Sequence, residues 1–405
     1  MMYGRIILRN LQQKALQTLL ITMMTAISTA LAILVLLLSS GIQEGLTKST
    51  QPFDLIVGAK GSPNQLVMNT VFLQDTPIGN IDTAIVTQLQ ENPLVETAIP
   101  LGFGDNYRGY RMIGTNAAIF SHKIKSGNPD WLQLKAGRAF SKPFEAVLGA
   151  KMAKETGLQI GDSFVSSHGI VANKQADVHH ESFTVVGILD TLQTPYDNGI
   201  LVNLDSLYRM HEAHRGDHAV DPSPADERQQ GVTAVLVKPR GYSEALQLYQ
   251  QFQARQDAQL IFPAQTILQF FSLLGQGEKV LQWIAYSVIS MTLFMIGCSL
   301  YWSAINRSRD YAILRAIGAN RKDLARLIFG EGMVILFLGI VIGMGIGHGI
   351  FILLANLLQK QMAISIISTF GGQEIFLIAM TFFCGMVVNL LPTLQASKRE
   401  IADAL

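Results

Sequence analysis

Four stretches of the chain are rich in apolar residues and contain no Asp, Glu, Lys or Arg: residues 15–40, 280–306, 332–359 and 375–397. Each is long enough to cross a hydrocarbon core of about 30 Å, for which a helix needs roughly 20 residues. The pattern therefore predicts four transmembrane helices, one near the N-terminus and three close together near the C-terminus. The polar and apolar residues between the first two runs indicate a large folded domain outside the membrane.

Basic residues flank the four runs unevenly. They are Arg5, Arg9 and Lys14 before the first run, Arg307, Arg309, Arg315, Arg321, Lys322 and Arg326 between the second and third, and Lys398 and Arg399 after the fourth. Positively charged residues near the ends of spans stay on the cytoplasmic side. We therefore expect both termini and the loop 307–327 inside the cell, and residues 42–278 outside.

The N-terminal segment has two features of a membrane anchor. Residues 3–11 carry apolar residues at helical spacing with basic residues between them, which is typical of a helix lying on the inner membrane surface. The alternative is a cytoplasmic extension of the first span, so that both form one bent helix. The first apolar run is about twice the roughly 7–15 residues of a signal-peptide core, which favours an uncleaved anchor.

The extracytoplasmic region reads as a mixed α/β domain. Turn residues separate short β-branched runs from amphipathic segments. We expect a strand at 53–57, a helix at 82–91 with Asp82 as N-cap, and a helix at 150–156 closed by Gly157. The histidine-containing stretch 179–181 reads as a polar loop. Further strands are expected at 146–148, 163–166, 183–188, 199–202 and 232–237, and a further helix at 243–255.

The predicted fold is thus an α-helical membrane protein with four transmembrane helices and a large α/β extracytoplasmic domain between the first and second. The expected segments are 1–41 (N-terminal amphipathic helix and first span), 42–278 (α/β domain), 279–306 (second span), 307–327 (cytoplasmic loop), 328–358 (third span), 359–374 (short outer loop), 375–397 (fourth span) and 398–405 (cytoplasmic tail).

Composition narrows the function. Hydrophobic residues make up 49% of the chain and charged residues 15%, and the net charge is +1. No basic patch lies outside the membrane flanks, which argues against a nucleic-acid partner. Cys298 and Cys384 both fall within predicted spans, so no disulfide framework is expected. The chain lacks the G-x-x-x-x-G-K-[ST] motif that cradles phosphates, and no catalytic constellation is evident, so we do not expect an enzyme.

Three motifs point to a known family. Residues 307–324 read RSRDYAILRAIGANRKDL, residues 149–163 run from GAKMA to LQIGDS, and residues 392–405 begin PTLQASKR. Together with the topology, they resemble the permeases of the MacB/FtsX superfamily, the type VII ABC transporters. The resemblance covers essentially the whole chain. One departure is Glu400-Ile401, where the family usually has a proline.

This resemblance implies that the loop 307–327 contains a coupling helix that engages an ATPase. Residues 310–316 are helix formers, and Gly318 is well placed to end the helix in the left-handed conformation. The residues that match the coupling element are Asp310, Leu314, Arg315, Ala316, Ile317, Gly318 and Ala319. The alternative is a basic loop that only fixes the topology.

The family also implies partners and a location. A separate ABC ATPase subunit would bind ATP and Mg²⁺, because this chain has no cofactor motif of its own. A second permease copy is expected, with a homodimer favoured, in the bacterial inner (cytoplasmic) membrane and in contact with membrane lipid. A periplasmic adaptor or an outer-membrane component is a further candidate partner.

Two further groups of residues are candidate sites. Gly339, Gly343 and Gly347 have the four-residue spacing that lets membrane helices approach closely, either within a dimer or against another span. His348 is an ionisable residue within the same apolar run. Five histidines of the outer domain have side chains suited to Zn²⁺, although a solvated polar loop is the simpler reading. They are His179, His180, His211, His214 and His218.

Two classes of function fit these features. The first is a dimeric permease that couples ATP hydrolysis by its partner to movement of the outer domain, and so to export or extraction of a substrate by mechanotransmission. The second is a transmembrane regulator that activates a periplasmic partner without transport. A metal- or haem-linked exporter is a narrower version of the first. The size of the outer domain favours transport.

Overall fold

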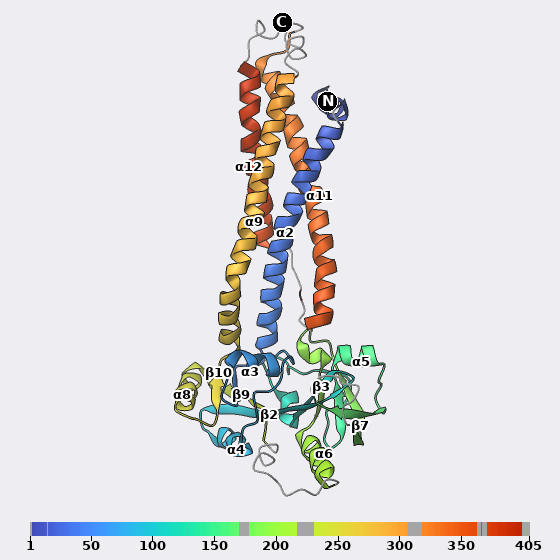
Figure 1. Ribbon diagram of the computed structural model, residues 1–405, viewed down its shortest axis with the longest axis vertical. Coiled ribbons are helices and arrows are strands. Elements are labelled where there is room, and N and C mark those ends of the chain that lie inside the picture. Colours follow the sequence, from blue (N-terminus) through green and yellow to red (C-terminus); the bar gives the residue numbers. More distant parts are fainter. Residues whose placement is uncertain are drawn as a thin grey trace. The chain divides into compact units, whose positions relative to one another are not determined.

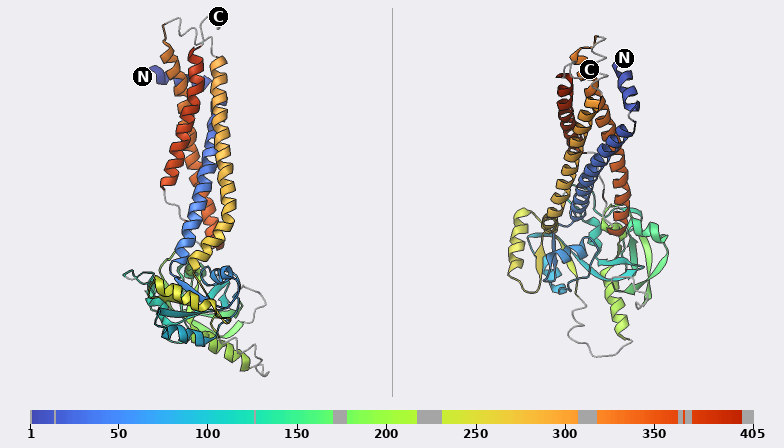
Figure 2. Two further views of the ribbon diagram at one scale, coloured as in Figure 1. Left: turned by 90° about the vertical axis from the view of Figure 1, so that its left-hand side faces the viewer. Right: turned by 45° about the horizontal axis from the view of Figure 1, so that its top comes forward.

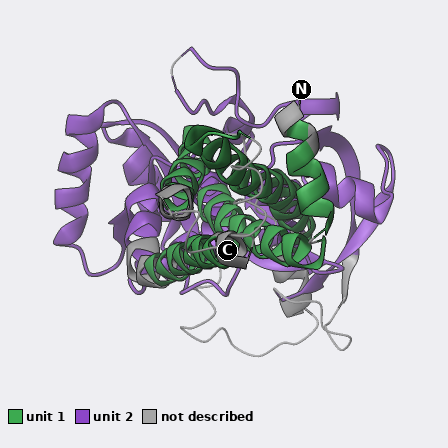
Figure 3. Cartoon of the chain, turned by 90° about the horizontal axis from the view of Figure 1, so that it is seen from above, with its two compact units in different colours: residues 1–41, 274–357, 366–405 green, residues 42–273, 358–365 purple. Residues whose placement is uncertain are grey.

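The computed structural model describes residues 2–13, 15–125, 127–169, 178–216, 231–306, 318–362, 366 and 371–398. It divides into two compact units (Figure 3). Unit 1 comprises residues 1–41, 274–357 and 366–405, and unit 2 comprises residues 42–273 and 358–365.

Unit 1 is built mainly from long helices (Figure 1), which are mostly apolar. Among the described residues, three helical segments are long and apolar enough to cross a membrane: Ala15–Thr50, Arg321–Gln359 and Gly372–Leu390. Within α9, the described apolar stretch Gln282–Cys298 is shorter. Three of the four expected spans therefore coincide with candidate spans, and the span in α9 stays a prediction. The helices are α1 (Met2–Gln13), α2 (Ala15–Thr50), α9 (Pro263–Asn306), α11 (Arg321–Met362) and α12 (Gly372–Lys398).

The core of unit 1 draws on all four long helices. Leu293 and Ile296 of α9 pack with Leu336 and Ile340 of α11, and residues of α2 and α12 complete the cluster. Ile6 and Ile7 of α1 pack on the first turns of α11. The N-terminal helix therefore has a protein partner in addition to any membrane surface. Figure 2 shows these helices from two further directions.

Unit 2 is an α/β domain built on a ten-stranded sheet of order β10-β1-β9-β2-β3-β8-β5-β7-β4, in which β6 pairs with β2 and β7. Most neighbouring strands are antiparallel, whereas β3–β8 and β5–β7 are parallel. The strands are β1 (Leu55–Gly58), β2 (Val95–Tyr107), β3 (Tyr110–Thr115), β4 (Leu134–Gly137), β5 (Glu145–Leu148), β6 (Ser163–His168), β7 (Val178–Leu189), β8 (Ile200–Asn203), β9 (Ala234–Pro239) and β10 (Gln259–Ile261).

Helices cover the sheet, so that its central strands are buried on both faces. In β1, Ile56 belongs to one hydrophobic cluster while Leu55 and Val57 belong to another. Such a strand reads as a continuous apolar run rather than an alternating one. The helices are α3 (Pro63–Thr70), α4 (Thr83–Glu91), α5 (Ala150–Thr156), α6 (Leu204–Gly216) and α8 (Tyr242–Gln253), with 3₁₀ turns at Ala117–Ser121 and Pro195–Asn198.

Several local predictions are confirmed. The carboxylate of Asp82 accepts a hydrogen bond from the backbone N–H of Ala84 and caps α4, as expected for an N-cap residue. Gly157 ends α5 in the left-handed conformation with φ 76°. The predicted polar loop at 179–181 is wrong, because these residues lie within β7 and extend its hairpin with β6.

Candidate helix-packing face and coupling segment

Three glycines of α11 face α2 within unit 1. A Cβ added at Gly339 would lie 2.5 Å from the Cβ of Thr25, and one at Gly343 would lie 2.6 Å from the backbone oxygen of Ala26. A Cβ at Gly347 would lie 3.1 Å from the oxygen of Ala30. The two backbones therefore approach so closely that side chains larger than hydrogen do not fit at the first two positions. Glycines permit such contact in lipid, where no hydrophobic force drives helices together.

The same helix carries glycines with a different environment. No atom lies within 4 Å of a Cβ built at Gly345 or Gly349. These two glycines lie on another face of α11 and make no comparable contact among the described residues. The close approach is thus a property of one line of glycines, with the other line as an internal control.

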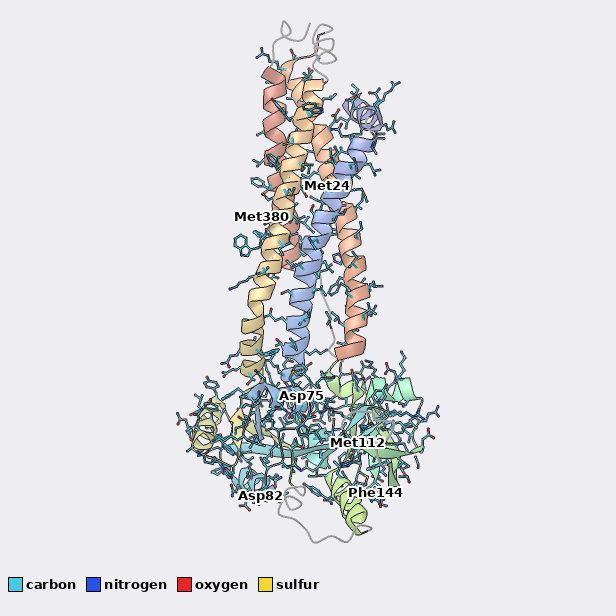
Figure 4. The ribbon with its side chains drawn as sticks, viewed as in Figure 1. Met24, Asp75, Asp82, Met112, Phe144 and Met380 are labelled. Atoms are coloured by element: carbon cyan, nitrogen blue, oxygen red, sulfur yellow. The ribbon has the colours of Figure 1, made fainter. Side chains whose placement is uncertain are left out.

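Hydroxyl side chains occupy the α2 side of this packing. Thr25 donates to the carbonyl oxygen of Ile21 at 2.8 Å, and Ser28 Oγ lies 2.6 Å from the carbonyl oxygen of Met24, which Figure 4 labels. Ser28 Oγ also lies 2.5 Å from Thr292 Oγ1 of α9. Bonds to the preceding turn satisfy hydroxyl groups that lipid cannot. As a result, α2 is held to α11 by close backbone packing and to α9 by a polar contact.

The coupling segment, residues 310–319, is described by the structure only at its C-terminal end. Asp310, Leu314, Arg315, Ala316 and Ile317 lie outside the described residues. Gly318 has φ 106°, a conformation that glycine adopts without strain, and Ala319 follows it. The backbone N–H of Asn320 donates to Asp323 Oδ2 at 3.1 Å, and α11 begins at Arg321. The predicted turn at Gly318 is therefore present, and a new helix starts directly after it.

Polar contacts tie three helices together near the start of α11. Asn10 Nδ2 of α1 donates to Glu331 Oε1 at 2.6 Å, and the Glu331 residue is only 6% exposed. Asn389 Nδ2 of α12 donates to the carbonyl oxygen of Phe329 at 2.8 Å. Neither contact was expected, although an acid at the edge of an apolar run, as at Glu331, is a recognisable signal. Hydrogen bonds therefore connect α11, the helix that follows the coupling segment, to both α1 and α12.

The predicted histidine cluster is only partly described. His179 and His180 lie on β7, and His211 and His214 lie on α6, but the placement of their side chains is outside the description. His218 lies outside the described residues altogether. Among side chains that the structure does describe, no group of three potential metal ligands is found.

Unit 1 also contains a cavity of about 740 Å³ between α9 and α12. Its lining includes no charged residue, and Tyr286, Ser290, Cys298, Met380 and Cys384 are among the residues that form it. Met380 is labelled on α12 in Figure 4. The two cysteines of the chain therefore line one apolar surface, and both are free thiols.

In unit 2, the end of α2 joins the domain core directly. The ring of Phe53, three residues after the helix, packs on Trp131 and Tyr196 with ring centroids 5.3 Å and 5.7 Å away. Lys48 Nζ donates to Gln193 Oε1 at 2.7 Å. Asp197 accepts the backbone N–H of Gln193 at 2.8 Å. Burial raises the pKa of Asp197, while hydrogen bonds from the backbone N–H groups of residues 192–194 lower it.

Comparisons with known proteins identify the class of protein. The model of the MacB-like periplasmic core domain matches residues 18–269, and the model of the FtsX-like permease C-terminal region matches residues 283–401. The first model alone covers more than half of the chain. The chain therefore belongs to the MacB/FtsX-type family of ABC transporter permeases, a family that is generally not catalytic and works with an ABC ATPase.

Individual relatives are distant. The chain is 24% identical over 247 residues to the uncharacterised ABC transporter permease YvrN of Bacillus subtilis, a match that spans 58% of this chain and 58% of YvrN. It is 22% identical over 340 residues to the lipoprotein-releasing system transmembrane protein LolC of Xylella fastidiosa, covering 80% of this chain and 75% of LolC. The solved periplasmic region of MacB from Actinobacillus actinomycetemcomitans is 12% identical, with a TM-score of 0.33 over 55% of this chain and 94% of that one.

Proposed function

We propose that this permease couples ATP hydrolysis by a separate ATPase subunit to movement of its outer domain, and that this movement exports or extracts a substrate by mechanotransmission. The observation that carries the proposal is the continuity of two helices. Both α2 and α9 run without interruption through residues of unit 1 and unit 2. A continuous helix transmits a tilt or rotation along its length, whereas a flexible linker would absorb it.

The contacts of α2 in both units support this role. Within unit 1, the helix contacts the glycine face of α11, which begins directly after the coupling segment. Within unit 2, Leu46 and Phe53 enter the main hydrophobic cluster of the domain. A displacement of α11 would therefore move α2, and α2 would move the core of the domain and not a surface loop.

We infer that α9 contains the predicted second membrane span, which completes the set of four. Trp283 and Trp302 are 70% and 63% exposed. They are 19 positions apart on one helix, which corresponds to roughly 28 Å at 1.5 Å per residue and matches a hydrocarbon thickness of about 30 Å. Tryptophan is enriched at both membrane interfaces. The distribution of basic residues then supports both termini in the cytoplasm and residues 42–278 outside. Labelling of single cysteines at residues 120 and 322, in a variant without Cys298 and Cys384, tests this orientation. A membrane-impermeant reagent should modify only residue 120 from outside.

The coupling role rests on Arg315 and the turn 317–319. Replacing Gly318 with valine would place a β-branched residue at φ 106°, which only glycine adopts readily. We expect Gly318→Val and Arg315→Glu to lose pull-down of the ATPase subunit and stimulation of its turnover. The matched control is Gly345→Val, which alters an unpacked glycine elsewhere. Normal binding and turnover in both coupling variants would contradict the proposed role.

A regulator that activates a periplasmic partner without transport is the second candidate function. The same helix continuity supports it, because movement of the outer domain serves either purpose. Mass spectrometry of the purified complex discriminates between them: bound small molecules or lipidated cargo indicate transport, and a stoichiometric hydrolase indicates regulation. A homodimer and a periplasmic adaptor or outer-membrane component are parts of the transport proposal that the same experiment tests.

A metal-linked exporter remains a narrower proposal. Its support is the density of imidazole groups at His179, His180, His211, His214 and His218, since neutral imidazole is a good Zn²⁺ ligand. Titration calorimetry with Zn²⁺ should then give stoichiometric heat that disappears in a variant with all five replaced by alanine. Equal binding by that variant would exclude these residues as the site.

A further inference from the structure

The imidazole of His348 and the carboxyl group of Glu374 meet within unit 1, where α11 passes the first turn of α12. His348 Nε2 lies 3.2 Å from Glu374 Oε1. The side chain of Glu374 is 1% exposed and that of His348 is 35% exposed. A carboxylate at such burial needs a compensating positive charge or a proton, because an unpaired buried charge is strongly destabilising.

The imidazole of His348 and the carboxyl group of Glu374 are close, but they do not form a hydrogen bond with good geometry. Neither oxygen of Glu374 has a partner with hydrogen-bond geometry among the described residues. The 3.2 Å contact is therefore electrostatic, between groups at hydrogen-bond distance. A buried polar group in this condition calls for a specific physical explanation.

The other nitrogen of the imidazole fixes its protonation. His348 Nδ1 lies 3.1 Å from the carbonyl oxygen of Met344. A carbonyl oxygen only accepts, so Nδ1 must carry a hydrogen. If Nε2 were unprotonated and Glu374 ionised, two acceptors would face each other around a buried negative charge. One proton, on Nε2 or on Oε1, removes both problems.

The four uncharged runs themselves supply no Asp, Glu, Lys or Arg that could compensate the charge of Glu374. The uncharged runs 15–40, 280–306, 332–359 and 375–397 contain one histidine, His348, and the connection 361–373 contains no charged residue. The remaining titratable residues in these runs are Tyr286, Cys298, Tyr301 and Cys384, which are neutral until alkaline pH. The nearest charged residues in sequence on the neighbouring helices are Glu44, Lys279 and Lys360.

We propose that His348 and Glu374 form a binding site for a single proton, and that this bound proton stabilises the packing of the first turn of α12 against α11. When the proton is bound, the pair has no net charge. When rising pH removes it, a buried negative charge remains, and the first turn of α12 must separate from α11 to reach water. The position of Glu374 in the first helical turn, where the helix dipole favours a negative charge, supports the form with imidazolium and carboxylate.

Backbone amide hydrogen exchange of the full chain in lipid nanodiscs tests the proposal without any ATPase. The exchange of residues 372–380 is measured from about pH 6 to about pH 9 and corrected for the intrinsic pH dependence of exchange. We expect protection in the wild-type protein to fall by about tenfold or more as the pH rises, which corresponds to one unit of pKa or more. Residues 383–390 of the same helix should change little and serve as the internal control.

Variants separate the proton site from general effects of pH. Glu374→Gln keeps the shape of the side chain, removes the acid, and should make the protection of residues 372–380 independent of pH. Glu374→Asp keeps the acid and should restore the dependence. A flat wild-type profile would overturn the proposal even if a variant failed to fold. An unchanged pH dependence in Glu374→Gln would overturn it as well.

Discussion

Adding one methyl group to the glycine face of α11 should push two membrane helices apart. In Gly343→Ala, the new Cβ would lie 2.6 Å from the backbone oxygen of Ala26 and 2.7 Å from the Cβ of Thr29. Ordinary contact begins at 3.4 Å, so the helices must separate by 3.4 − 2.6 = 0.8 Å. Because the contacted atom is backbone, no side chain can rotate away. Gly339→Ala requires a similar shift, and Gly347→Ala, at 3.1 Å, requires only 0.3 Å.

The expected loss of unfolding free energy follows from these shifts. Overpacking of a well-packed contact costs about 1–3 kcal/mol, whereas replacing a helical glycine with alanine gains up to about 1 kcal/mol in propensity. The propensity gain is common to all five glycines. Gly345→Ala and Gly349→Ala, where no atom lies within 4 Å, should therefore be neutral or stabilising. We expect Gly339→Ala and Gly343→Ala to be less stable than these controls by about 1–3 kcal/mol, with Gly347→Ala between them.

Equilibrium unfolding of the full chain in mixed micelles, titrated with a denaturing detergent and followed by tryptophan fluorescence, gives these differences. The comparison among five glycines of one helix removes effects of the micelle. Equal losses at the two lines of glycines would refute the packing argument, as would the absence of any loss at Gly339 and Gly343.

Two further predictions concern the α/β domain. Hydrogen bonds from Arg138 hold the pKa of Glu145 at about 2, below its ordinary 4.5. Ionised Glu145 therefore stabilises the folded domain above about pH 4.5, and this stabilisation is lost as the pH falls towards 2. Glu145→Gln should lower the thermal midpoint at pH 7 and weaken this acid sensitivity, while Glu91→Gln on the surface should change neither. Trp131→Ala removes a buried ring that contacts Phe53 and should cost about 3–5 kcal/mol of unfolding free energy; the control Tyr242→Ala, at a residue 73% exposed, should cost far less, and equal effects would contradict the assignment of Trp131 to the core.

Much of the fold was predictable because its signals are local. Uncharged runs locate the membrane helices, and a capping carboxylate or a terminal glycine marks α4 and α5. The hairpin of β2 and β3 was not predicted. Its two-residue turn is Arg108-Gly109, with φ 52° and 88°. Such turns are usually recognised from Asn-Gly or Asp-Gly, so arginine hides the signal. Burial of β2 along most of its length also removes the alternation of polar and apolar residues.

The candidate sites, too, were predictable from the sequence only where their signal is local. The glycine spacing identified the residues of α11 that approach another helix, but the sequence left open whether the partner was a second copy or another span. Only the fold identifies α2 as a neighbour. The contact of His348 with Glu374 depends on how two helices far apart in sequence pack, and no local pattern reports it. The same holds for Asn10 and Glu331.

The central claim is that events at the ATPase reach the outer domain through this chain. The most direct test compares hydrogen exchange of residues 42–273 in the purified complex, once without nucleotide and once with ATP bound to an ATPase subunit that cannot hydrolyse it. The account predicts that ATP changes exchange in the domain, particularly around Phe53 and Trp131, and that Gly318→Val abolishes the change. Identical exchange in the two states, in a complex that binds ATP, would contradict it.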